Sequence, residues 1–113
     1  MDRAEARQLL DGELERMRRL SYADLRVQMP RVTGVYRFLG ATAWLERGGE
    51  TPRHHEVLGP SGTRYMLEVA LTWEDEPEGN IHVSVSIDDG KPGFAWLVSD
   101  GFVISPNGQL SDG

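Results

Sequence analysis

The sequence predicts an α+β domain in which an N-terminal helix packs on one face of a four- to five-stranded antiparallel meander. Three observations support this fold class: a helical apolar stripe near the N-terminus, strict apolar–polar alternation in the second half, and short Gly- and Pro-rich turns between the alternating runs. We expect one domain over residues 1–113. Residues 1–30 are helical, residues 31–53 form a connector whose conformation the sequence does not determine, and residues 54–113 form the meander.

The first 20 residues read as an amphipathic helix. Its apolar side chains recur at three- and four-residue spacing, at Ala6, Leu10, Leu14 and Met17. Ser21 and Asp24 then occupy the two side-chain positions of a capping box, which predicts a new turn of helix. Pro30 should end this turn, because a proline disfavours helical geometry in the residue before it.

Residues 34–45 are apolar but follow neither the helical nor the strand period. A strand, a short helix and a hydrophobic flap all remain open for this segment. If its large side chains are not buried in the monomer, they form a patch of the kind that marks an interface. Tyr36, Phe38 and Trp44 are therefore candidate interface residues, and a homodimer is the simplest outcome.

Alternating runs at residues 64–74, 81–88 and 94–99 predict half-buried strands. Because one face of each strand should pack against the helix, we expect a core built from one set of alternate residues. The expected core residues are Leu10, Leu14, Met17, Leu67, Val69, Leu71, Val83, Val85, Phe94 and Trp96. A last short strand should run through Phe102 and Ile104 and turn at residues 106–108.

The turn lengths predict the register of the first two hairpins. A three-residue loop in "GPSGT" pairs Val57 with Tyr65. A five-residue loop, Asp75–Gly79, pairs Thr72 with His82. Both registers keep the apolar residues on one face, which is an independent check because a shift by one residue would expose them.

The stretch "HHE" at residues 54–56 suggests a metal site, but its position on a strand argues against one. His54 and His55 are adjacent, so their side chains point to opposite faces of the sheet. The register places His54 opposite Glu68, whereas His82 lies roughly 13 Å further along, too far for ligand bonds of about 2 Å. We expect a hairpin strand here, with no metal and no cofactor.

The polar face of the meander holds the candidate ligand- or partner-binding residues. If Phe94 pairs with Ile87, then Ser99 lies opposite His82, and Asp100 completes the residue types of a hydrolase triad. No nucleophile elbow accompanies them, and Asp100 adjoins Ser99 in sequence, so a polar cross-strand pair is the better interpretation. The candidate residues are Arg64, Glu68, Thr72, His82, Ser84 and Ser99.

Small residues occupy the middle of this polar face, at Ala70, Ser84, Ser86 and Ala95, so it could form a shallow trough. The face is either a solvated sheet surface or a groove that residues 34–45, a second subunit or a ligand covers. Whether residues 34–45 close a pocket over His82 decides between the two, since catalytic sites are usually concave.

Composition narrows the classes of partner. Residues 1–56 hold ten arginines and nine acids, whereas residues 57–113 hold two cations and nine acids, for a net charge of −6 overall. The acidic second half argues against nucleic-acid binding. We expect no membrane partner either, because no apolar run approaches the roughly 20 residues of a membrane helix. The charged N-terminus and the lack of cysteine favour a cytoplasmic protein.

The motifs "LSYADL", "TWEDEPEGNIHVSVSIDDG" and "ISPNGQL" together resemble a family of small bacterial proteins of unknown function. The resemblance covers about two-thirds of the chain and implies a helix ending in a Leu-Ser-Tyr turn, followed by a meander with an Ile-Asp-Asp-Gly turn. Residues 31–52 are longer than the connector of that family. The resemblance implies the fold and a bacterial source, and it implies no activity.

These observations favour a small soluble protein that acts as a non-catalytic binding or assembly module, with itself or an unidentified protein as its partner. The alternative is a small enzyme or ligand sensor that uses the polar face, with His82 as the acid–base group, because an ordinary histidine titrates near neutral pH.

Overall fold

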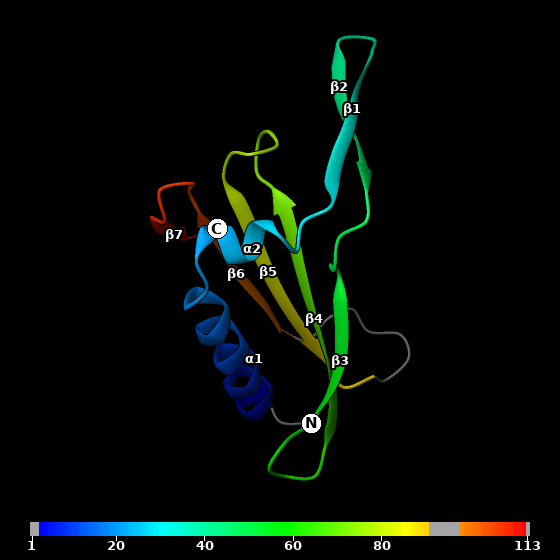
Figure 1. The fold of residues 1–113 in the computed structure, drawn as a ribbon. Coiled ribbons are helices and arrows are strands. Elements are labelled where there is room, and N and C mark those ends of the chain that lie inside the picture. Colours follow the sequence, from blue (N-terminus) through cyan, green and yellow to red (C-terminus); the bar gives the residue numbers. More distant parts are fainter. Residues whose placement is uncertain (1–2, 91–97, 113) are drawn as a thin grey trace.

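The computed structural model describes residues 3–90 and 98–112 and shows an α+β fold with two antiparallel sheets (Figure 1). Two helices pack on one face of the five-stranded sheet, and the two-stranded sheet extends away from it. In chain order the elements are α1 (Arg3–Arg18), α2 (Tyr22–Arg26), β1 (Arg31–Phe38), β2 (Ala41–Arg47), β3 (Arg53–Leu58), β4 (Arg64–Trp73), β5 (Ile81–Asp88), β6 (Val98–Ile104) and β7 (Leu110–Asp112).

The two-stranded sheet departs from the single sheet that the sequence predicts. Strands β1 and β2 come from the segment that fits neither period in the sequence, and within the described residues they pair only with each other. Every residue of β2 is exposed. A hairpin that buries neither face needs no alternation of apolar and polar residues, which explains why the strand period is missing from residues 34–45.

Helix α1 forms over the predicted segment and contacts β5 and β6. Its apolar stripe is buried as expected, at Ala6, Leu10, Leu14 and Met17. The capping box at the start of α2 is also confirmed: the Asp24 N–H donates to Ser21 Oγ at 3.1 Å, and the Ser21 N–H donates to the Asp24 carboxylate at 3.0 Å. Sequence alone therefore determines the helical part of the fold.

The five-stranded sheet is a meander with strand order β3-β4-β5-β6-β7. Val57 pairs with Tyr65, and Thr72 pairs with His82, so both predicted hairpin registers are confirmed. The described members of the predicted core are buried, and the predicted Phe94 and Trp96 lie outside the described residues. The predicted turn at residues 106–108 is present, with the Gly108 N–H donating to Ser105 O at 2.8 Å.

The predicted register of the third hairpin is wrong. Ile87 pairs with Val98 instead of Phe94, so Ser99 lies opposite Ser86 and His82 lies opposite Val103. The predicted short strand through Phe102 and Ile104 is the second half of β6. The difference from the predicted register is four residues, and an even shift leaves every side chain on its predicted face. Alternation therefore could not distinguish the two registers.

A buried carboxylate joins α1 to the β3–β4 turn. Glu5, which is 7% exposed, accepts hydrogen bonds from the Ser61 N–H at 2.9 Å, the Ser61 hydroxyl at 2.7 Å and the Tyr65 hydroxyl at 2.8 Å. These bonds, led by the Ser61 hydroxyl, lower the pKa of Glu5 below its ordinary value of 4.5. The contribution of Glu5 to stability is thus fully present above that value and is lost as the pH falls through the lower folded-state pKa.

We expect Glu5→Gln to lower the stability of the fold at neutral pH, because an amide has one acceptor oxygen where the carboxylate uses two, and it carries no negative charge. The difference between the two proteins should shrink as the pH falls below 4.5 and through the lowered pKa of Glu5, because the wild-type carboxylate then becomes protonated. Urea unfolding midpoints measured across this range test the expectation. Glu15→Gln is the control, because Glu15 is exposed on the same helix. Parallel curves for the wild type and Glu5→Gln would contradict it.

Candidate functional site

The structure places all six candidate residues of the polar face on the side of the sheet opposite the helices. Cross-strand pairing puts Thr72 beside His82, and it puts Ser99 beside Ser86. Ser99 therefore lies roughly 13 Å from His82 along the sheet, since four residues of strand separate them. Ser99 and His82 are not brought together, so the residue types of the triad form no nucleophile–base pair.

Within the described residues, His82 has none of the partners that an acid–base group uses. Among residues 3–90 and 98–112, no side chain forms a hydrogen bond or ion pair with it. Gly101 lies close to His82. A Cβ added at Gly101 would lie 3.3 Å from His82 Nε2 and 2.4 Å from Val83 O. Gly101 is therefore needed for close strand packing. A carboxylate that would orient the imidazole is missing from the described surroundings.

The histidine pair at the start of β3 has a structural role. His54 lies opposite Glu68, as predicted, and its Nε2 is 2.7 Å from Glu68 Oε2. His55 lies opposite Leu67 and so points to the other face. Arg64 of the polar face makes an exposed ion pair with Glu56 at 3.4 Å. These contacts link β3 to β4, and exposed pairs of this kind contribute little to stability.

Residues 31–47, which we call the arm, carry the main concentration of uncovered apolar side chains. Alternation and the β1–β2 register divide the arm into two faces. The outer face carries Arg31 and Arg47 at its base and is uncharged beyond them, along Gly34, Tyr36, Phe38, Ala41, Ala43 and Leu45. The inner face carries Val32, Val35, Arg37, Thr42, Trp44 and Glu46. The interface residues expected from the sequence are thus split, because Trp44 lies on the opposite face from Tyr36 and Phe38.

The arm does not cover the polar face of the large sheet. It stands at the far end of the molecule, beyond the end of β4 (Figure 1). Its large side chains are exposed: Tyr36 by 53%, Phe38 by 60% and Leu45 by 53%. The rings of Tyr36 and Phe38 stack with centroids 6.2 Å apart. The arm therefore closes no pocket over His82. The enzyme alternative requires such a pocket, so it lacks this support.

The tip of the arm is a two-residue turn that sequence reasoning missed. Phe38 pairs with Ala41, which leaves Leu39 and Gly40 as the turn, both with positive φ, 52° and 81°. This geometry favours Asn or Gly at the first position, and a leucine there is uncommon. Leu39 is also 90% exposed. The only signal in the sequence is a lone Gly40 inside an apolar run, and it lacks the usual Asn or Asp before it.

We call the two helices and the five-stranded sheet the body. A hollow of about 660 Å³ lies where the arm joins the body. We call it the base hollow. Its apolar lining is Val27, Met29, Pro30, Val32, Trp73 and Pro77. Arg26 and Glu78, which form an ion pair, stand beside it, and this pair holds the pKa of Arg26 above its usual value.

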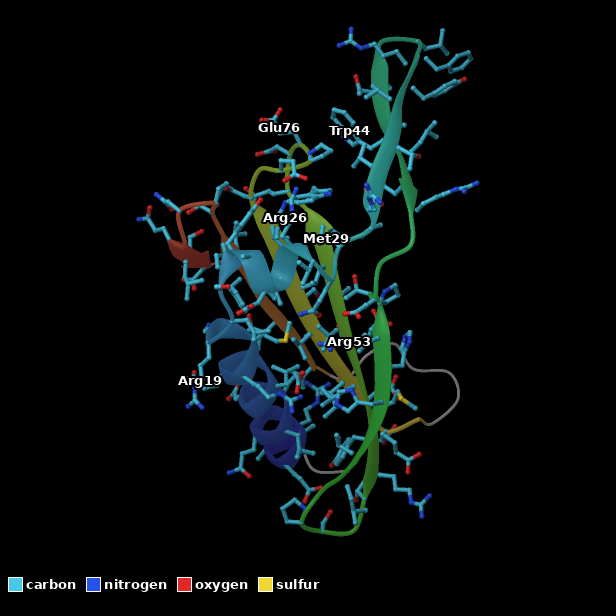
Figure 2. All side chains as sticks on the ribbon, in the orientation of Figure 1. Arg19, Arg26, Met29, Trp44, Arg53 and Glu76 are labelled. Atoms are coloured by element: carbon cyan, nitrogen blue, oxygen red, sulfur yellow. The ribbon has the colours of Figure 1, made fainter. Side chains whose placement is uncertain are left out.

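A second hollow, of about 160 Å³, continues between Trp44 and Glu46 of the arm and the end of β4. Figure 2 shows Trp44 projecting from the arm on the side of the turn that carries Glu76. The inner face of the arm therefore looks toward the body. Trp73 lines both hollows, and its buried indole N–H has no acceptor within the described residues.

Comparison of the chain with protein-family models, with curated proteins and with solved structures finds no match. The family that the turn motifs suggest thus stays a prediction. In the part of the chain that the structure describes, no helix is long and apolar enough to cross a membrane. Over the same residues, no group of three or more His, Asp or Glu side chains is placed to hold a metal ion.

Proposed function

We propose that the protein is a non-catalytic assembly module that binds its partner through the arm. The observation that supports this most directly is the exposure of the large apolar side chains of the arm. Contiguous exposed apolar surface of this kind marks interaction sites in folded proteins. An isolated two-stranded hairpin is also marginally stable in water, so a bound partner would stabilise the arm as well.

The arm offers two modes of contact, packing of apolar side chains and pairing of a strand edge. Between residues 34 and 45 its outer face is apolar and includes two aromatic rings, a residue type enriched in interface cores. Its two strands pair only with each other within the described residues, so each has an edge whose backbone groups can pair with another strand. The body contributes the scaffold that holds the arm away from the sheet.

Site-specific photocrosslinking tests this function. We expect benzoylphenylalanine in place of Phe38 on the outer face, which is 60% exposed, or of Trp44 on the inner face, which is 37% exposed, to give a covalent adduct in cells that produce the protein. The same group in place of Leu58, which is 67% exposed on β3, should give little adduct. Mass spectrometry of the adduct identifies the partner. Equal labelling from Leu58 and from the arm, or no labelling from either arm position, would contradict the proposal.

A further inference from the structure

Two opposite charges stand unpaired on the inner face of the arm. Arg37 lies at the level of Thr42, near the tip, and Glu46 lies near the base. Both are exposed, and neither forms an ion pair among residues 3–90 and 98–112. Four residues of strand separate their levels, which is roughly 13 Å and too far for a contact within one chain.

A second copy of the arm can satisfy both charges at once. If two inner faces pack antiparallel about a two-fold axis at the Val35–Trp44 pair, Arg37 of each copy lies at the level of Glu46 of the other. Parallel packing would place like charges together. Opposite charges set the register and orientation of such interfaces, and a two-fold axis repeats the contact on both sides.

The same axis brings the tip to the base hollow. Counting along β2 from Trp44, the tip residues Leu39 and Gly40 reach the level of Gly48 and Gly49 of the other copy. Gly49 is packed against Pro30, which lines the base hollow. The exposed leucine of one chain thus arrives at the apolar hollow of its partner without any adjustment of register.

The tip and the hollow are both apolar, so contact between them would bury exposed apolar surface. Leu39 is 90% exposed, and the hollow is lined by Met29, Trp73 and two prolines. Burial of a leucine side chain in such a site removes apolar surface from water and is favourable.

We propose that the partner of the arm is a second copy of this chain. In this dimer two arms pack antiparallel through their inner faces, and each tip enters the base hollow of the other copy. The inference rests on the proposed function and names its partner. The arm alone is smaller than the roughly 20–30 residues that each side of a standard interface contributes. A reciprocal dimer adds the residues that line the hollow of each copy, which enlarges the interface.

Charge reversal in the purified protein tests the pairing. We expect the wild type to sediment as a dimer of the 12.6 kDa chain at micromolar concentration. Arg37→Glu and Glu46→Arg each create two like-charge contacts, so each should weaken self-association at least about tenfold. An equal mixture of these two variants should form a heterodimer, because both contacts then join opposite charges. The double variant should self-associate like the wild type.

Leu39→Asn tests the tip separately. Asparagine favours the positive φ of this turn, so the hairpin should form at least as well while the apolar contact is lost. We expect at least about tenfold weaker dimerisation from two lost leucine contacts. Leu58→Asn, which removes a leucine of β3 that is 67% exposed, should leave the dimer unchanged.

Three results would overturn the inference. The first is a wild type that stays monomeric up to submillimolar concentration. The second is dimerisation that neither charge reversal nor Leu39→Asn weakens. The third is two weakened single variants whose mixture does not associate. In each case an adduct of Phe38 or Trp44 with a different protein would leave the proposed function standing, whereas the lack of any adduct from both positions would remove that function as well.

Discussion

Val85→Asp should lower the free energy of unfolding by about 4 kcal/mol or more, enough to unfold many small domains. Val85 is fully buried at the centre of the five-stranded sheet, between Val69 on β4 and Asp100 on β6. A carboxylate there would lose its hydration. It would also face Asp100, whose pKa is already held below its usual range, chiefly by a hydrogen bond from Arg7 at 2.6 Å.

Thermal and urea unfolding measure this effect. Leu58→Asp is the control, because it introduces the same carboxylate at an apolar residue of β3 that is 67% exposed and lies outside the arm and the base hollow. It should change stability by less than about 0.5 kcal/mol. If Val85→Asp unfolded at the same urea concentration as the control, the register of β4, β5 and β6 would be wrong.

Phe102→Ala should cost about 3–5 kcal/mol, the usual range for deletion of a buried aromatic ring. Phe102 is 1% exposed and lies opposite Val83, in the part of β6 that packs against the helices. The guanidinium of Arg18 at the end of α1 stands 5.4 Å from its ring centroid. Loss of the ring therefore leaves a cavity and also removes a cation–π contact between helix and sheet.

The control makes the same substitution at an exposed ring. Phe38→Ala, at a residue that is 60% exposed on the arm, should leave the unfolding midpoint of the body nearly unchanged. Arg18→Gln should cost at most about 1 kcal/mol and so isolates the cation–π share. A small effect of Phe102→Ala would mean that β6 does not bring this ring under α1, and that the third hairpin register needs revision.

Local chemistry determined the helices and the first two hairpins. The Ser21–Asp24 capping box places a polar partner next to unpaired N–H groups, and its two residues are only three positions apart. Loop length likewise fixes which residues of a hairpin face each other, so Val57 meets Tyr65 as predicted. Here the interacting residues are close in sequence, and few alternative arrangements compete with the correct one.

Pattern was insufficient where two arrangements satisfy it equally. Ser99 lies beside Ser86 and not beside His82 because β6 is shifted by four residues from the predicted register. An even shift leaves both faces of the sheet unchanged, so the alternation in the sequence carries no information about it. The predicted polar-face residues are on the right face for this reason, and the predicted Ser99–His82 contact is wrong for the same reason.

The sequence by itself determined the α+β class, the buried stripe of α1, the faces of β4 and β5, and the surplus of apolar residues in residues 34–45. Only the tertiary structure decided that this surplus forms an arm, with Trp44 on one face and Tyr36 and Phe38 on the other. The physical reason is that an element buried on one face needs apolar residues at a regular spacing, whereas an arm exposed on both faces does not. What the arm contacts depends on surfaces distant in the chain, such as the hollow between Met29 and Trp73, which exist only after folding.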